Sequence, residues 1–204
     1  MEANFWHERW AKKEIGFHMP RPHAALADYW EQLGLTTGSR VFVPLAGKSL
    51  DLIELAARGH DVVGIELSAV AVAEFHAENP QQSRIDLRCG DFFELTPAAL
   101  GAVAAVFDRA ALVALPPDMR RAYAAKMTEL TAPGTVTLLI TMEYDQREMR
   151  GPPHAVQRDE VRSLYGESHD IRELGTYGAL ADFPRMSARG VTALAERVYC
   201  LRRR

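Results

Sequence analysis

The stretch Val41-Phe-Val-Pro-Leu-Ala-Gly-Lys-Ser49, followed by Val62-Val-Gly-Ile-Glu-Leu-Ser68, decides the fold of this chain. An apolar run, a turn that contains glycine and an amphipathic stretch lead into a second apolar run, which stops at the acidic residue Glu66. This order is typical of the first βαβ unit of a Rossmann-like sheet, with the acid at the carboxyl end of the second strand. A carboxylate there can accept hydrogen bonds from both hydroxyl groups of a ribose. We therefore expect Glu66 to bind a nucleoside cofactor.

The turn between the two strands narrows the choice of cofactor. A dinucleotide site requires Gly-x-Gly-x-x-Gly, so that the backbone and a helix N-terminus can approach a pyrophosphate. Residues 44–48 contain a single glycine, Gly47. The triplet Gly47-Lys48-Ser49 matches the end of a phosphate-binding P-loop, but the first glycine of that motif would fall on Phe42. A cofactor with a ribose and no phosphate fits better, so we predict S-adenosylmethionine, with an NAD(P)-dependent oxidoreductase as the disfavoured alternative.

The composition is that of one globular domain with a single sizeable core, because 48% of the 204 residues are hydrophobic. A net charge of −3 gives no general attraction to nucleic acid or to an anionic membrane. The two cysteines, Cys89 and Cys200, form no Cys-x-x-Cys pair. The first residues lack the pattern of a signal peptide, and no apolar run approaches membrane-spanning length. We expect a cytoplasmic monomer with no nucleic-acid or membrane partner.

Apolar runs that are typical of strands recur along the chain, and helical patterns separate the early ones. The expected strands are Arg40–Leu45, Asp61–Leu67, Ile85–Cys89, Val103–Asp108, Thr135–Met142, Asp170–Leu174 and Val191–Leu201, and the expected helices are Ser49–Arg58, Ala69–Glu78 and Pro117–Thr131. Alternating strands and helices predict an α/β fold, a Rossmann-like seven-stranded, mostly parallel sheet with helices on both faces. An irregular polar stretch joins the last two strands, which indicates an antiparallel C-terminal hairpin at one edge. Many S-adenosylmethionine-dependent methyltransferases share this architecture.

Further candidate residues follow the third and fourth strands. Asp91 can reach an adenine amino group, and of the rings of Phe92 and Phe93 we expect one in the core and one at the cofactor. Arg109 follows the fourth strand, beside the crevice where open α/β sheets bind ligands. A cation so near a sulfonium makes sense only if an anion approaches too, such as a thiolate. An ion pair between Arg109 and Asp108, or a neighbouring acid, is the structural alternative.

The segment before the first strand is unusually aromatic. Trp6 and Trp10 lie four residues apart and so share a helix face, and Phe17 and His18 follow. Docking of a helix by the two indoles is one interpretation. The other is a helical N-terminal lid within residues 1–35, with Trp10 against the cofactor and Phe17 and His18 toward the substrate. The histidines show no metal-ligand spacing, so no metal is predicted.

Together these residues resemble the thiopurine S-methyltransferase family, over about Phe5 to Leu201. The matching segments are Phe5-Trp-His, Trp10, Gly16-Phe-His18, Val43-Pro-Leu-Ala-Gly-Lys-Ser49, Gly59-His60, Val63-Gly-Ile-Glu-Leu-Ser68, Cys89-Gly-Asp-Phe-Phe93, Asp108-Arg-Ala-Ala-Leu-Val-Ala-Leu115, Glu143-Tyr-Asp-Gln146 and Gly151-Pro-Pro153. The resemblance implies cofactor contacts at Trp10, Leu45, Glu66, Asp91, Phe92 and Arg109, to which we add Gly47 of the turn. It implies a substrate-side position for Phe17, to which we add His18 and Arg185.

The family resemblance implies transfer of the methyl group of S-adenosylmethionine to a thiopurine or other thiol, or to a related chalcogen acceptor. We expect in-line displacement by a soft anion, with Arg109 as the catalytic residue. A non-catalytic domain that binds the cofactor as a sensor is the alternative. The link Asn79–Ile85 is shorter than in typical members. We therefore expect a more open acceptor pocket, unless Tyr177–Ser187, with Arg185, folds across the gap.

Overall fold

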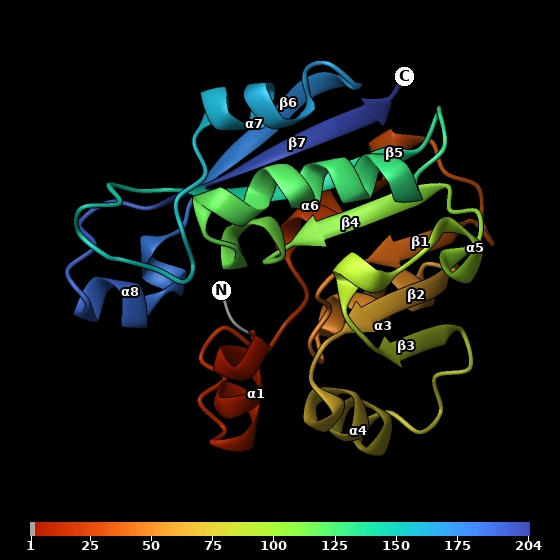
Figure 1. The fold of residues 1–204 in the computed structure, drawn as a ribbon, viewed down its shortest axis with the longest axis horizontal. Coiled ribbons are helices and arrows are strands. Elements are labelled where there is room, and N and C mark those ends of the chain that lie inside the picture. Colours follow the sequence, from red (N-terminus) through yellow and green to blue (C-terminus); the bar gives the residue numbers. More distant parts are fainter. Residues whose placement is uncertain (1–2) are drawn as a thin grey trace.

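The structure, a computed structural model, describes residues 3–204, with a seven-stranded sheet at its centre (Figure 1). All seven predicted strands are present, and the sheet confirms the predicted fold class. The strands are β1 (Arg40–Val43), β2 (Asp61–Glu66), β3 (Ile85–Cys89), β4 (Ala105–Arg109), β5 (Val136–Glu143), β6 (His169–Gly178) and β7 (Ala195–Arg203). Their spatial order is β3-β2-β1-β4-β5-β7-β6. The last strand begins four residues later than predicted, because residues 191–194 still belong to the connection from β6.

The strand directions bring the functional ends of the strands together. β1 pairs in parallel with both β2 and β4, and β3 and β5 extend the parallel set on either side. β7 runs antiparallel between β5 and β6, so the predicted C-terminal hairpin is present. The chain order reverses between β1 and β4, which is the switch point where open α/β sheets bind ligands. The residues after β1, β2, β3 and β4 therefore surround one crevice.

Helices cover both faces of the sheet, and each face has its own apolar core. The helices are α1 (Ala3–Ala11), α2 (Ala24–Tyr29), α3 (Leu50–Ala57), α4 (Ala69–Glu78), α5 (Pro97–Leu100), α6 (Pro117–Leu130), α7 (Arg158–Tyr165) and α8 (Pro184–Ala188). α2, α3 and α4 pack on one face, and α5, α6 and α7 pack on the other. The long helices α3, α4 and α6 lie within one residue of the predicted bounds, because serine caps α3 and α4 and prolines begin α6.

The N-terminal region divides into two parts with different roles. Residues 24–33 belong to the core under the sheet, where the fully buried Trp30 donates a hydrogen bond of 2.9 Å to His60. Neither core cluster contains a residue before Ala25. α1 instead contacts α4 and lies beyond the carboxyl ends of the parallel strands, as does α8 (Figure 1). The part of the predicted 1–35 cover that lies over the crevice is therefore the segment before α2, and Met1 and Glu2 of that cover lie outside the described residues.

Candidate functional site

The turn after β1 adopts an unusual backbone conformation. Leu45 has a φ of +46° and Gly47 a φ of +55°, so two of its residues lie in the left-handed region. The amide of Ala46 donates to the carbonyl of Ile65 in β2 (2.9 Å), and the amide of Gly47 donates to Oε2 of Glu66 (2.9 Å). Leucine does not favour a positive φ. These bonds to β2 therefore fix a turn that its own sequence does not prefer.

Backbone amides hold both oxygens of the Glu66 carboxylate. Its side chain is buried, and its second oxygen, Oε1, accepts a hydrogen bond of 2.7 Å from the amide of Ser68. Burial raises the pKa of Glu66, while the hydrogen bonds from the amides of Ser68 and Gly47 lower it in part. Each carboxylate oxygen has two acceptor positions, and one amide occupies only one of them. The carboxylate thus retains acceptor capacity beyond these two bonds, and its binding of a ribose hydroxyl stays a prediction.

The residues after β3 divide between the surface and the core. Asp91 is exposed, and its Oδ1 accepts from the amide of Phe93 (2.8 Å) and so caps the short 3₁₀ helix Phe92–Glu94. The ring of Phe92 is buried between Phe42 and Tyr123, whereas Phe93 is only partly buried. The inward ring is thus that of Phe92, the residue that the family resemblance places at the cofactor, and Phe93 is the more accessible of the two. A cofactor-binding role for Asp91 and Phe92 stays a prediction.

Adjacent residues of β4 have opposite environments. Asp108 is buried, and it accepts from the hydroxyl of Tyr123 (2.8 Å) and from the amide of Leu112 (3.3 Å). Burial raises the pKa of the Asp108 carboxyl to about 6. Arg109 is partly buried, and its side chain forms no hydrogen bond or ion pair with any residue of 3–204. The alternative of an ion pair between Arg109 and Asp108 is therefore wrong, and the guanidinium is available to an anionic ligand.

The aromatic residues of the N-terminal segment form a cluster over the turn after β1. Trp10 is only 3% exposed, and its ring makes an edge contact with Phe17 at 5.6 Å. Phe17 also contacts Trp6 at 5.5 Å. A methyl group placed on Gly47 would lie 3.3 Å from the indole of Trp10. The structure thus places Trp10 against the turn after β1 and Phe17 against Trp10, and a role of this segment as a cover stays a prediction.

His18 follows this cluster and is partly buried. Burial lowers its pKa, and the positive charges of Lys48 and Arg109 lower it further, against smaller opposing effects of Glu78 and Glu74. The imidazole is therefore neutral at pH 7. A role of His18 on the substrate side stays a prediction.

The segment between β6 and β7 reaches the N-terminal cover. A methyl group placed on Gly16 would lie 1.6 Å from Nη1 of Arg185 in α8, so the guanidinium lies directly against Gly16. Asp182 forms an ion pair of 2.6 Å with Arg21. Arg185, predicted on the substrate side, is therefore close to the residue that precedes Phe17 in sequence.

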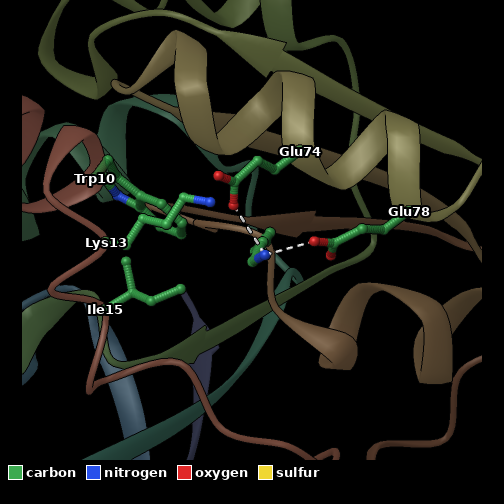
Figure 2. A pocket seen from close by; sticks show the side chains of 6 residues that line it. Trp10, Lys13, Ile15, Glu74 and Glu78 are labelled. Atoms are coloured by element: carbon green, nitrogen blue, oxygen red, sulfur yellow. Dashed lines mark hydrogen bonds and ion pairs between the residues drawn. The ribbon is translucent and has the colours of Figure 1, made fainter.

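A pocket of about 290 Å³ lies between α1 and α4, and Figure 2 shows it from close by. Trp10, Lys13 and Ile15 line one side, and Glu74 and Glu78 point into it from α4. Both carboxylates form ion pairs with Lys48, at 2.9 Å and 2.6 Å. This arrangement was not predicted from the sequence. The available signal was two glutamates four residues apart on the predicted helix Ala69–Glu78, together with a lysine in the turn after the first strand.

Comparison with known proteins identifies the family. The sequence profile described as thiopurine S-methyltransferase matches residues 1–204. A thiopurine S-methyltransferase of Methylococcus capsulatus is 42% identical over 217 aligned positions, which cover 99% of this chain and 98% of the relative. One of Nitrosospira multiformis is 43% identical, with 98% of each chain covered.

The chain belongs to the thiopurine S-methyltransferase family. This confirms the predicted family and enzyme class, and the S-adenosylmethionine that its members use as methyl donor. A structural neighbour shows the same fold, namely a Burkholderia thailandensis N1-methyltransferase solved with S-adenosylhomocysteine. It has a TM-score of 0.69 and 16% identity, and the match covers 98% of this chain and 86% of that one. The alignment with the Methylococcus enzyme has 217 positions for a chain of 204, so at least 13 positions of that alignment are gaps in this chain.

The described residues fit the cofactor of a thiopurine S-methyltransferase. Glu66 retains acceptor positions for two hydroxyl groups, and a turn with positive φ at Gly47 brings backbone close to it. Leu45 and Trp10 provide apolar surface beside that turn. No helix among residues 3–204 is both long and apolar enough to cross a bilayer.

The raised pKa of the buried Asp108 predicts that the stability of the fold depends on pH. Its pKa in the folded state is about 6 instead of 3.8, so the folded state binds its proton more tightly than the unfolded state does. The free energy of unfolding should therefore fall as pH rises from about 4 to 6, by about 3 kcal/mol relative to Asp108→Asn, which does not titrate. Urea unfolding of both proteins at several pH values measures this difference.

A matched control for this experiment is Asp159→Asn, because the side chain of Asp159 is 93% exposed. The difference between wild type and this variant should stay nearly constant over the same pH range. A difference for Asp108→Asn that is equally constant would show that the carboxyl has an ordinary pKa in the folded state.

Proposed function

We propose that this thiopurine S-methyltransferase family member transfers the methyl group of S-adenosylmethionine to a thiol, or to a related chalcogen acceptor, by in-line displacement. The observation that carries the proposal is Arg109, a partly buried guanidinium with no ionic partner among residues 3–204. A buried cation without a counter-ion is costly, so it indicates an anionic ligand. A thiolate or selenolate is such an anion.

Glu66, the turn after β1 and Arg109 have different roles in the proposed reaction. When bound, S-adenosylmethionine supplies an electrophilic methyl group on a sulfonium. Glu66 binds its ribose, and the turn of Leu45 and Gly47 lies beside it. Arg109 favours the ionised form of the acceptor, so a thiol of low pKa needs little help from a general base near pH 7. The protein then contributes mainly alignment and electrostatic stabilisation.

The N-terminal segment is proposed to exclude water. Trp10 and Glu66 are 3% and 7% exposed, and Trp10 packs against the turn that holds Glu66, so a ribose reaches the carboxylate only after side chains around it move. α1 is suited to such movement, since it contributes no residue to either core cluster. A cover that opens for the cofactor and closes for transfer would gate the reaction.

For localisation, oligomeric state and partners, a cytoplasmic monomer without a nucleic-acid partner remains our prediction. The second candidate function, a sensor that binds the cofactor without catalysis, would leave Arg109 without an anion. Methyl transfer from labelled S-adenosylmethionine to a panel of aromatic and aliphatic thiols separates the enzyme from the sensor, because a sensor labels no thiol.

The first functional prediction concerns Arg109. Arg109→Lys keeps the charge but loses the planar fork of donors, so kcat/KM for an aromatic thiol should fall at least about tenfold. A steady-state assay with labelled S-adenosylmethionine measures kcat/KM. The control is Arg121→Lys, the same substitution at a residue of α6. Wild-type turnover in Arg109→Lys would remove Arg109 from the catalytic machinery.

The second prediction concerns the N-terminal cover. Removal of residues 1–18 should abolish transfer while the remaining domain still folds, because neither core cluster uses this segment. Circular dichroism checks the fold and the thiol assay checks transfer. A milder variant, Trp10→Ala, should retain the helix and lose most activity. Full activity of the truncated protein would contradict the proposed gating.

The third prediction concerns the size of the acceptor pocket. The contacts of Arg185 with Gly16 and of Asp182 with Arg21 favour the alternative in which the segment before β7 covers the site. The enzyme should therefore select thiols by size, and Arg185→Ala should raise KM most for the small acceptors. Kinetics over thiols of increasing size test this. Equal KM values for small and large thiols in the wild type would instead indicate an open pocket.

A further inference from the structure

We infer that Lys48, held by Glu74 and Glu78, is a positioning residue that sets the geometry of the Glu66 carboxylate and so the affinity for the cofactor. The inference goes beyond methyl transfer itself and rests on the proposed role of Glu66 in binding the ribose. It assigns a function to a group of charges beside the turn after β1 that the mechanism does not use. Figure 2 shows the two carboxylates of this group.

The clamp of Lys48, Glu74 and Glu78 differs from an ordinary surface ion pair. The side chain of Lys48 is only 10% exposed, and its ammonium contacts both carboxylates, at 2.9 Å and 2.6 Å. Exposed ion pairs contribute little, because water screens them and ordering two long side chains costs entropy. Burial by itself lowers the pKa of Lys48, but the hydrogen bonds to Glu78 and Glu74 raise it overall, so the lysine remains charged.

The clamp closes a ring of contacts around Glu66. One oxygen of Glu66 is held by the amide of Gly47, the residue directly before Lys48. The other oxygen is held by the amide of Ser68, which is the N-cap residue of α4. Lys48 in turn is tied to α4 through Glu74 and Glu78. The two amides that orient the carboxylate therefore lie on two segments, and the clamp fixes the distance between those segments.

The turn needs such external support. Positive φ values at Leu45 and Gly47 cost free energy, which the surrounding contacts must supply. The hydrogen bond from Ala46 to β2 holds one end of the turn, and the hydroxyl of Ser49 caps α3 at the other. Lys48 is the only side chain of this turn with an ion pair to another element within residues 3–204. Without it, the Gly47 amide has greater freedom to leave Glu66.

Binding of S-adenosylhomocysteine, measured by calorimetry, tests the inference without reference to activity. Lys48→Met removes the clamp and keeps the aliphatic stem, so Kd should rise about tenfold, on the scale of a hydrogen bond to a charged group. Lys48→Arg keeps two ion pairs and should restore most of the affinity. The matched control is Arg58→Met, because Arg58 also bridges two glutamates, Glu31 and Glu54, but at the far end of α3.

A double-mutant cycle decides whether the clamp acts through Glu66. If it does, Lys48→Met should change Kd less than about twofold when it is added to Glu66→Gln, because the two changes share one pathway. A full tenfold loss in that background would overturn the inference, as would wild-type affinity of Lys48→Met. Wild-type affinity of Glu66→Gln would instead reject the ribose role of Glu66, and the clamp inference with it. If Lys48→Met does not fold, the double variant Glu74→Gln with Glu78→Gln replaces it, with the same expected loss and the same overturning result.

Discussion

The hydrogen bonds that two backbone amides donate to the buried carboxylate of Glu66 are the constraint on which the rest of the site depends. Burial disfavours the charged form of Glu66, and these two amides compensate in part. One amide belongs to the turn after β1, and the other belongs to the N-cap residue of α4, which follows β2. The two bonds therefore also connect the ends of β1 and β2. A carboxylate that is already desolvated and oriented loses little on meeting a ribose, because the cost of ordering it was met during folding.

The fourth strand illustrates how one backbone register separates structure from chemistry. Successive side chains of a strand point to opposite sides. Asp108 points toward α6, where the hydroxyl of Tyr123 satisfies it in the core. Arg109, the last residue of β4, points away from that partner and stays without an ionic one among residues 3–204. Asp108 stabilises the packing of α6 on β4, and Arg109 remains available to a ligand.

The sequence predicted β1, β2, β4 and β5 well because they are buried apolar runs, whereas the largely exposed edge strand β6 ends four residues later than predicted. The short helices α2 and α8 were not predicted, since helices of six and five residues lack a full amphipathic period. Glu66 and Arg109 were recognisable because each ends a strand. The clamp at Lys48 was not, because its partners come from α4, some 26 to 30 residues on, and only the fold brings them together. Likewise, nothing local distinguished Phe92 from Phe93, and packing against Tyr123 decided which ring is buried.

We propose that the acceptor side of the site is made by the segment before α2 and by the segment between β6 and β7, so that it can vary in sequence independently of the cofactor side. Leu45, Gly47 and Glu66 lie on the first βαβ unit, where a change of backbone would disturb the sheet. Gly16 and Arg185 lie on segments outside the sheet, and they meet each other over the crevice. Such segments tolerate substitution and changes of length without loss of the core. On this proposal, contacts between the segment before α2 and the segment before β7 offset the shortened link after α4, and a change in them alters acceptor specificity without altering cofactor binding.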